Sequence, residues 1–340
     1  MRPSGPATMK DVAERAGVSV PTVSRFLSGA ARVREDKRLR IAAAVADLGF
    51  TPNAAARALV GRPPQVVSVL TGDTSRYGYA ETIRGVEEAA RSAGFVVTIT
   101  ALDSAADEAV AGAVALAMSQ PIAGVVVLKF DAAGAAALER LPAWLPTVAL
   151  AGARERGRAQ AVIREEHGAR LVVEHLLGLG HHTVHHLRVP AQGGELGRTA
   201  GWRAALRAAG RPVPEVLETT WEPAAARRIG HLLAERRDVT ALFCGNDEVA
   251  MGVAAGLRDR GVAVPRDISL VGFDDHPIAE LWDPALTTVR QDFAELGRRG
   301  WRMLAGRIQG STSTRLVSLT PDLILRASTA PPPSAGRTAP

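Results

Sequence analysis

Residues 8–29, TMKDVAERAGVSVPTVSRFLSG, constrain the fold of this chain more than any other stretch. Thr8 is a favourable N-cap, and Asp11 can return a hydrogen bond to it, so the pair predicts the start of a helix. Gly17 permits the left-handed turn that ends this helix. Pro21 suits the first turn of a second helix, which Ser19 is expected to cap. Two short helices joined in this way predict a helix-turn-helix, whose second helix normally lies in a DNA major groove.

The apolar positions of these helices predict their buried faces. The first helix is expected to bury Val12, Ala13 and Ala16, and the second Val23, Phe26 and Leu27. The second helix then points five residues outward, namely Val20, Pro21, Thr22, Ser24 and Arg25. A third helix is expected over residues 35–48, with Leu39, Ile41, Ala42, Val45 and Leu48 buried. Arg34, which precedes it, predicts a weak N-cap.

A short segment, FTPNAAARALVG (residues 50–61), follows the third helix, and Pro52 suits the first turn of another short helix. The order VAxxAGVS, TVSR and LGFTPNAAARAL resembles the DNA-binding head of the LacI/GalR family of repressors. The resemblance implies a head over residues 1–62, in which residues 50–61 form a hinge helix that folds on DNA in the homodimer. This head holds 11 Lys/Arg and 5 Asp/Glu, so the whole net charge of +6 lies on it. Such asymmetry suits neutralisation of DNA phosphates and predicts salt-sensitive binding.

The family resemblance also implies roles for single residues in the head. Val20, Pro21 and Arg25 occupy positions that read base edges, and an arginine can pair bidentately with guanine. Thr22, Ser24 and Asn53 are expected to contact phosphates, which position the protein but do not specify the sequence. Arg57 suits the DNA backbone or minor groove. Leu59 matches the family's minor-groove wedge, and its alternative role is packing against the partner's hinge helix.

From Gln65 onward, short apolar runs alternate with helical stretches such as residues 79–93 and 106–119. The first runs are QVVSVL, FVVTIT, AGVVVLKF and TVALAG, and a second set includes HTVHHLR, TALFCGN and DISLVGFDD. This alternation predicts an α/β fold with a doubly wound parallel sheet. The two sets predict two similar lobes over residues 63–330, resembling periplasmic-binding-protein-like sensors. The resemblance implies three crossings between the lobes, with residues after about 291 returning to the first, and residues 331–340 are expected to form a disordered Pro-rich tail.

Polar residues stand where open α/β sheets bind ligands, at the carboxyl ends of strands. Asn246 follows the run LFCG, Asp274 follows LVGF, and Arg198 begins the segment RTAGW, which matches the family's RxxGW. A pyranose requires hydrogen-bonding groups for its hydroxyls and an apolar or aromatic surface for its C–H face. Trp221 and Phe293 are expected to stack on the sugar ring. The full set of residues expected to bind an effector is Arg198, Trp221, Asn246, Asp274, Gln291 and Phe293.

Two positions depart from the family pattern. Ala151 stands at or near a position where an acidic residue is common, and Arg164 stands where the family often has Asp. An arginine facing the pocket would admit an acidic or phosphorylated sugar. Alternatively, Arg164 is surface charge or pairs with Glu165 or Asp274.

Catalysis and metal binding find no support in the sequence. His181 belongs to the family's Leu-Gly-His turn, whereas His182, His185 and His186 surround a predicted strand whose adjacent residues face opposite sides. These side chains therefore do not converge on a metal ion. Cys244 lies in an apolar strand and is expected in the core, and a single cysteine fits a reducing cytoplasm. No nucleophile–base pair, cofactor motif or membrane-spanning run of 18 apolar residues occurs.

The sequence therefore predicts a cytoplasmic, homodimeric transcription regulator, a repressor that binds a palindromic double-stranded DNA operator and is released by a small sugar. A corepressor-dependent regulator of the same fold is the alternative. A sugar transport receptor would require a signal peptide and no basic head, and the chain has the opposite features. A sugar-active enzyme is the remaining competitor, which an assay for sugar hydrolysis would exclude.

Overall fold

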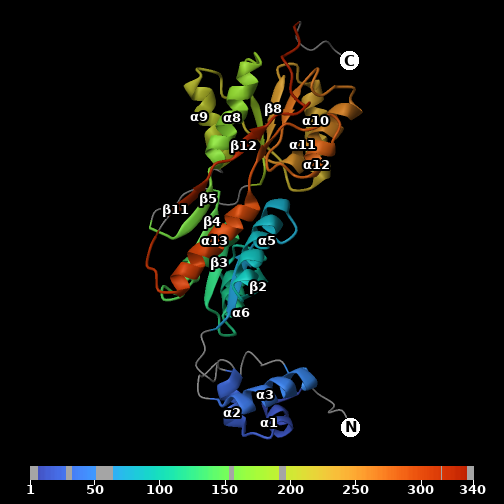
Figure 1. Cartoon of the computed structure of the whole chain (residues 1–340). Helices are drawn as coiled ribbons and strands as arrows, with labels where there is room; N and C mark the ends of the chain where they lie inside the picture. Colours follow the sequence, from blue (N-terminus) through green and yellow to red (C-terminus); the bar gives the residue numbers. More distant parts are fainter. Residues whose placement is uncertain are drawn as a thin grey trace. The chain divides into compact units, whose positions relative to one another are not determined.

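A computed structural model describes residues 7–27, 33–50, 64–152, 157–190, 197–314 and 316–334. The chain divides after Gln65 into two compact units, a helical head and a larger sensor (Figure 1). Residues 51–63 lie outside the described residues, and they include most of the expected hinge helix together with Asn53, Arg57 and Leu59. The end of the expected tail, residues 335–340, also lies outside them.

The head contains the helix-turn-helix that its sequence predicts. Its described helices are α1 (Met9–Ala16), α2 (Val20–Leu27) and α3 (Glu35–Leu48). The Thr8 backbone N–H donates to Asp11 Oδ2 over 2.7 Å, and the Thr8 hydroxyl accepts from the Asp11 backbone N–H, which completes a capping box. Gly17 ends α1 with a left-handed φ of 61°. The buried core of the head consists of Val12, Ala13, Ala16, Val23, Ile41, Ala44 and Phe50.

Two of the residues expected in the buried face of α3 are exposed. Leu39 is 65% exposed and Ala42 also faces solvent, whereas Ala44 is buried. The buried stripe runs through Ile41, Ala44, Val45 and Leu48, the i, i+3, i+4, i+7 spacing of one helix face, so the prediction for Leu39 and Ala42 was wrong. The weak cap at Arg34 is confirmed, because its side chain makes no capping hydrogen bond. The hydroxyl of Ser19 hydrogen-bonds the Thr22 hydroxyl.

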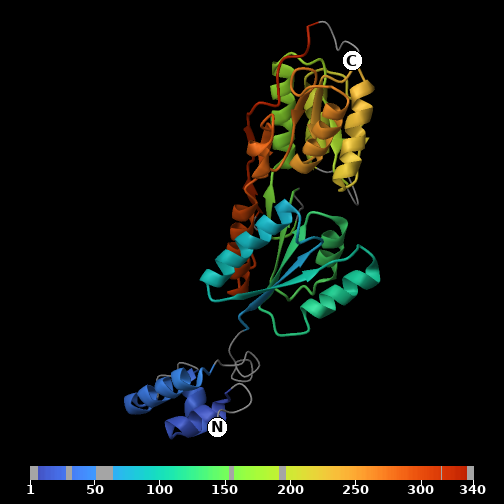
Figure 2. The same ribbon diagram turned by 90° about the vertical axis from the view of Figure 1, so that its right-hand side faces the viewer.

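The first lobe of the sensor is built on a parallel sheet with helices on both faces. Among the described residues its strands are β1 (Val66–Thr71), β2 (Val96–Ala101), β3 (Gly124–Lys129), β4 (Thr147–Ala151), β5 (Gln160–Ile163) and β11 (Leu316–Leu319). Their order across the sheet is β11-β5-β4-β3-β1-β2. Helices α5 (Tyr77–Ser92) and α13 (Phe293–Ile308) cover one face, and α6 (Asp107–Ala117) and α7 (Ala132–Arg140) cover the other (Figure 2).

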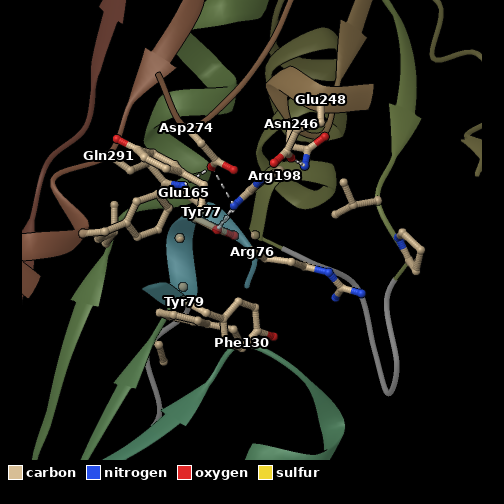
Figure 3. Close-up of a pocket in the computed structure, with 18 of the residues that line it drawn as sticks. Arg76, Tyr77, Tyr79, Phe130, Glu165, Arg198, Asn246, Glu248, Asp274 and Gln291 are labelled. Atoms are coloured by element: carbon tan, nitrogen blue, oxygen red, sulfur yellow. Dashed lines mark hydrogen bonds and ion pairs between the residues drawn. The ribbon is translucent and has the colours of Figure 1, made fainter. Parts of the chain in front are cut away.

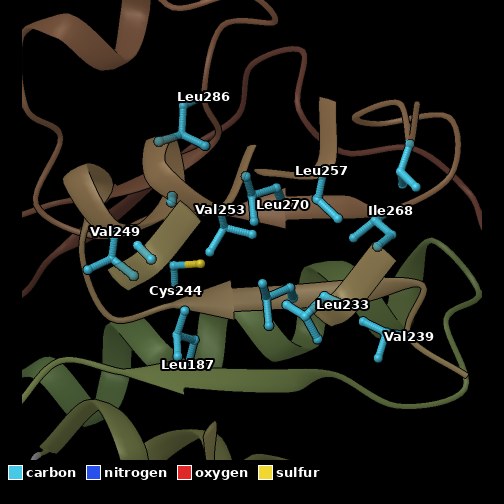
Figure 4. Packing of buried hydrophobic residues seen from close by; sticks show 14 of the residues in the cluster. Leu187, Leu233, Val239, Cys244, Val249, Val253, Leu257, Ile268, Leu270 and Leu286 are labelled. Atoms are coloured by element: carbon cyan, nitrogen blue, oxygen red, sulfur yellow. The ribbon is translucent and has the colours of Figure 1, made fainter. Parts of the chain in front are cut away.

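The second lobe repeats this arrangement on a smaller sheet. Its described strands are β6 (His185–Arg188), β7 (Leu217–Glu218), β8 (Ala241–Cys244) and β9 (Ser269–Val271), in the order β7-β6-β8-β9. Its helices are α8 (Glu165–Gly178), α9 (Gly197–Ala208), α10 (Pro223–Glu235), α11 (Asp247–Asp259) and α12 (Ile278–Leu281). Cys244 is fully buried among apolar side chains of β6, β8, β9 and α11, as its sequence context predicts (Figure 4). Burial raises the pKa of its thiol.

The described chain crosses between the lobes three times, as the family resemblance implies. The first crossing joins β5 to α8, and the second joins β10 (Thr288–Arg290) to α13. The third joins β11, which pairs with β5, to β12 (Asp322–Ile324), which pairs antiparallel with β10. Beyond β12 the backbone N–H of Ala330 donates to the Ser269 hydroxyl, so the end of the described chain lies on the second lobe.

Of the histidines of GHHTVHHL, His181, His185 and His186 are buried in the second lobe, whereas His182 is exposed. His186 is stacked on Phe243, and its ring nitrogens lie 3.0 Å from the Phe243 carbonyl and 3.0 Å from the Thr199 hydroxyl. Burial lowers its pKa to about 4. Within the described residues, no cluster of three or more His, Cys, Asp or Glu side chains is placed to hold a metal ion. None of the described helices combines the length and apolarity that crossing a membrane requires.

Helices α5 and α13 approach closely at small residues, and this contact yields a stability prediction. A Cβ on Gly85 would lie 2.0 Å from the Ala294 carbonyl oxygen, whereas a Cβ on Gly112 in α6 would meet nothing within 4 Å. We expect Gly85→Ala to lower the free energy of unfolding by about 1–3 kcal/mol, because the two helices must separate. The control Gly112→Ala should raise it by about 0.5–1 kcal/mol, because alanine favours the helix. Urea denaturation followed by circular dichroism measures both, and equal midpoints for the two variants would refute the close contact.

Candidate functional site

A cavity of about 180 Å³ lies in the sensor between the carboxyl ends of the two parallel sheets. All six residues that the sequence assigns to an effector site line it: Arg198, Trp221, Asn246, Asp274, Gln291 and Phe293. Figure 3 shows Arg198, Asn246 and Asp274 converging from the second lobe, with Tyr79 and Phe130 of the first lobe on the opposite side. The fold therefore brings together residues that are far apart in the sequence.

Arg198 is the centre of the polar side of this cavity. Its Nε and Nη2 donate to Glu165 Oε1 over 3.0 and 2.9 Å, and Nη2 lies 3.2 Å from Asp274 Oδ1. Its Nη1 donates to the carbonyl of Gly245, and its guanidinium lies over the Phe273 ring. The side chains of Arg198, Glu165 and Asp274 are each only 12% exposed. A buried arginine with this many partners is held in one orientation.

Asp274 lies beside Arg198 at the end of the run that follows β9. Its backbone has a φ of 107°, and its N–H donates to the Val289 carbonyl over 2.8 Å. Its Oδ1 accepts a hydrogen bond from Gln291 Nε2 at 2.7 Å. Burial raises the pKa of Asp274 to about 7, although Arg198 and Gln291 act in the opposite direction. Near neutral pH this carboxyl is therefore ready either to accept hydrogen bonds from ligand hydroxyls or to change its charge.

Asn246 both caps a helix and lines the cavity, and the sequence alone could not decide between these two roles. Its Oδ1 accepts from the Val249 backbone N–H over 2.9 Å, which caps α11, and its Nδ2 donates to Glu248 Oε2. The same side chain lines the cavity. Asp247, the next residue, is buried and accepts hydrogen bonds from the Thr288 hydroxyl and the His276 backbone N–H. Its pKa is raised by burial and by the nearby Asp274 carboxylate.

The first lobe supplies an aromatic surface opposite the polar residues. Phe293 makes edge contacts with Tyr77 and Phe130, with ring centroids 6.1 and 6.5 Å apart. The Tyr79 hydroxyl donates to Asp131 Oδ2 over 2.7 Å, which fixes this ring beside Phe130. The cavity thus has hydrogen-bonding groups on one side and ring faces and edges on the other, the combination that a pyranose requires.

Sequence reasoning missed several lining residues, namely Arg76, Tyr77, Tyr79, Phe130, Glu165 and Glu248. The rule that located Asn246 could have found Phe130, which directly follows β3. Tyr77 and Tyr79 follow β1 after a short loop and are the only two tyrosines in the chain. The sequence around Glu165 gives no such signal, because the role of Glu165 depends on the packing between the N-terminal ends of α8 and α9.

Of the two residues that depart from the family pattern, one lines the cavity and the other does not. Ala151 lines the cavity. Arg164 is exposed at the start of α8 and is absent from the described cavity lining, which agrees with the surface-charge alternative. Arg198, rather than Arg164, pairs with Glu165 and Asp274.

In the head, α2 presents the side chains that the sequence assigns to DNA. Val20 is 39% exposed, and Pro21 and Arg25 are also exposed. Thr22 and Ser24 are half-buried, whereas Val23 faces the core. The helix therefore packs through one side and leaves the other available to a major groove.

Comparison with known proteins places this arrangement in a family. The profile described as "Bacterial regulatory proteins, lacI family" matches residues 8–53, and a "Periplasmic binding protein-like domain" matches residues 173–329. The lactose operon repressor of Escherichia coli (strain K12) is 30% identical over 331 residues, which cover 96% of this chain and 92% of the repressor. The chain belongs to the lacI family.

Another curated relative and two solved structures agree with this assignment. The transcriptional repressor PurR of Proteus mirabilis is 30% identical, with 96% of this chain and 98% of PurR covered. The lac repressor dimer bound to operator and the anti-inducer ONPF has a TM-score of 0.88 at 29% identity, with 96% and 100% covered. A complex of the regulator CelR with cellobiose has a TM-score of 0.70 at 27% identity, with 95% and 99% covered. This lacI-family chain is a DNA-binding transcription regulator with a two-lobed sensor, which confirms the predicted fold and class of function.

The raised pKa of Asp274 gives a pH prediction for the ligand-free protein. Between the ordinary value of 3.8 and about 7, the folded protein holds a proton that the unfolded chain releases, so stability falls as pH rises through this window. Asp274→Asn removes this titration. We therefore expect the Tm of the variant minus that of the wild type to increase from about pH 5 to about pH 8. Thermal melts across this range measure the difference, and a difference independent of pH would contradict the buried carboxyl.

Proposed function

We propose that this regulator is a repressor that acts as a homodimer on a palindromic DNA operator in the cytoplasm and is released by a small sugar. The observation that carries the proposal is the Arg198–Glu165–Asp274 network facing an aromatic wall in one cavity, on a chain that also carries a helix-turn-helix. The operator-bound dimer and the cellobiose complex among its structural relatives support the same reading.

The sugar would bind through the two sides of the cavity. Asp274 accepts hydrogen bonds from ring hydroxyls, and Arg198, already oriented by Glu165, donates to hydroxyl oxygens. Asn246 and Gln291 add polar contacts at the edge, and Phe293 receives the C–H face of the ring. Each group is held by the protein before the ligand arrives, which lowers the entropy cost of binding.

The head would read the operator through α2. Val20, Pro21 and Arg25 contact base edges, with Arg25 specifying a guanine, while Thr22 and Ser24 contact phosphates. Asn53, Arg57 and Leu59 keep the roles that the family resemblance implies: a phosphate contact, a contact to the DNA backbone or minor groove, and a minor-groove wedge. Sugar binding closes the two lobes and disfavours the DNA-bound form of the dimer, by about 1–3 kcal/mol in typical allosteric systems.

A corepressor-dependent regulator of the same fold is the second candidate, because a ligand in the sensor cavity can be coupled to operator binding with either sign. The two candidates differ in the sign of one effect. A ligand that weakens operator binding supports release by a sugar, whereas a ligand that strengthens operator binding supports a corepressor.

The base-reading role of Arg25 is testable with operators selected from a random DNA pool. Arg25→Ala should lower affinity for the selected operator by about 1–3 kcal/mol more than affinity for random DNA. The control Lys10→Ala removes the same charge from the exposed surface of α1 and should not change this ratio. Fluorescence anisotropy at several salt concentrations measures both affinities. If Arg25→Ala lowers the affinity for operator and for random DNA by the same factor, Arg25 does not read a base.

The effector role of Asp274 has a separate test. Asp274→Ala leaves Arg198 with fewer partners and the hydroxyls without an acceptor, so sugar affinity should fall by about 2–5 kcal/mol. The variant should still bind the operator and should no longer be released. The control Arg164→Asp changes an exposed charge and should leave release intact. A thermal-shift screen of neutral and phosphorylated sugars measures binding, and a sugar that stabilises the wild type and Asp274→Ala equally would exclude this cavity as its site.

A further inference from the structure

A separate cavity lies at the opposite end of the first-lobe sheet from the effector cavity. It has a volume of about 160 Å³ and lies where β4, β5 and β11 begin, whereas the effector cavity lies where the strands end. Helices α7 and α13, which cover opposite faces of the sheet, both end beside it. Most of the residues that line it are aliphatic, and two are arginines. We call it the amino-end cavity.

The aliphatic part of the amino-end cavity has the size of a site for a small ring. Leu138 in α7 and Leu145 before β4 are 3% and 2% exposed, and Leu141 directly follows α7. On the side of the sheet, Ala149 and Ala159 contribute only methyl groups. An apolar cavity of about 150 Å³ is large enough to hold benzene. The amino-end cavity therefore has room for a six-membered ring or a short hydrocarbon chain.

Arg307 is the polar group of this cavity whose hydrogen bonding is incomplete. Its Nη1 donates to the Ser313 carbonyl over 3.3 Å. Its Nε is buried and has no acceptor within the part of the chain that the structure describes. Arg307 lies in the last turn of α13, where a cation interacts favourably with the helix dipole. That position explains the charge but leaves a buried N–H without an acceptor, which is unfavourable. An anion in the cavity would supply the acceptor.

Arg158 adds a second guanidinium to the same cavity. Its Nη2 donates over 2.7 Å to Oε1 of Glu139, whose side chain is 63% exposed. Water screens an ion pair at such an exposed position, so the pair only partly offsets the charge of Arg158. None of the described residues that line the cavity is acidic. Two arginines in such a lining favour an anion, and the planar guanidinium group matches a carboxylate through two parallel hydrogen bonds.

We propose that the amino-end cavity binds a small organic anion, whose carboxylate pairs with Arg307 and Arg158 and whose ring or chain packs on the leucines. This site is independent of the proposed function, because it shares no residue with the effector cavity. A neutral sugar lacks the charge that the two arginines require, and inorganic phosphate lacks the apolar group that the leucines require. The ligand therefore belongs to a different chemical class from the proposed effector.

Isothermal titration of the full-length protein with benzoate tests this site. Benzamide has the shape of benzoate without its charge, and inorganic phosphate has a charge without a ring. Benzoate should bind saturably and at least ten-fold more tightly than either. Arg307→Met and Arg158→Met keep an apolar stem but remove the guanidinium, and each should weaken benzoate binding about ten-fold. The control Arg302→Met removes the same charge from α13 at a 62% exposed position outside the cavity and should leave benzoate affinity unchanged.

A further variant distinguishes this site from the cavity between the lobes. Arg76 lines that cavity, so a loss of benzoate binding in Arg76→Met, with none in Arg307→Met and Arg158→Met, would place benzoate there and overturn the inference. Equal affinities for benzoate and benzamide, or for benzoate and phosphate, would also overturn it, as would a wild-type protein that does not bind benzoate saturably. Circular dichroism checks the fold of each variant. If Arg307→Met does not fold, Arg158→Met, at a position that is 37% exposed, decides the result.

Discussion

The sensor depends on the compensation of one buried charge, the Arg198 guanidinium. A buried arginine without partners is strongly unfavourable, and here Glu165, Asp274 and the Gly245 carbonyl surround it. These partners come from α8, from the segment after β9 and from the residue after β8, so the network joins α9 to three other parts of the second lobe. Because the network lies at the carboxyl ends of the strands, the groups that stabilise Arg198 also form the polar side of the ligand cavity.

The two lobes divide the chemistry of recognition between them. The second lobe carries most of the charged and amide groups together with the Trp221 ring. The first lobe carries the rings of Tyr77, Tyr79, Phe130 and the returning Phe293, together with Arg76 and Lys129. A sugar in the cavity would contact both lobes at once, which makes ligand binding a reason for the lobes to close. The guanidinium carbon of Arg76 in the first lobe lies 3.9 Å from the centre of the Trp221 ring in the second, so one contact already joins the lobes across the cavity. Closure of this kind is the two-state element that an allosteric regulator needs.

Sequence reasoning predicted the fold class and six lining residues because strand ends and family motifs mark them directly. Asn246 and Asp274 follow apolar runs, and Arg198 starts a recognisable helix motif. Glu165 was missed because its partner is 33 residues away and only the packing of α8 on α9 brings them together. The buried face of α3 was misjudged at Leu39 for a similar reason, since apolar residues occur around much of that helix and tertiary contacts choose among them.

Release of the operator by a sugar requires that the cavity and the DNA-binding head are energetically coupled. Thermodynamic linkage requires that a sugar which weakens operator affinity must itself bind more weakly to the operator-bound protein, by the same factor. The decisive measurement is the Kd of one sugar for the full-length protein, titrated alone and in the presence of saturating operator. Such coupling predicts that operator raises this Kd by about 5- to 150-fold, matching the loss of operator affinity at saturating sugar. A sugar Kd that operator leaves unchanged would contradict it.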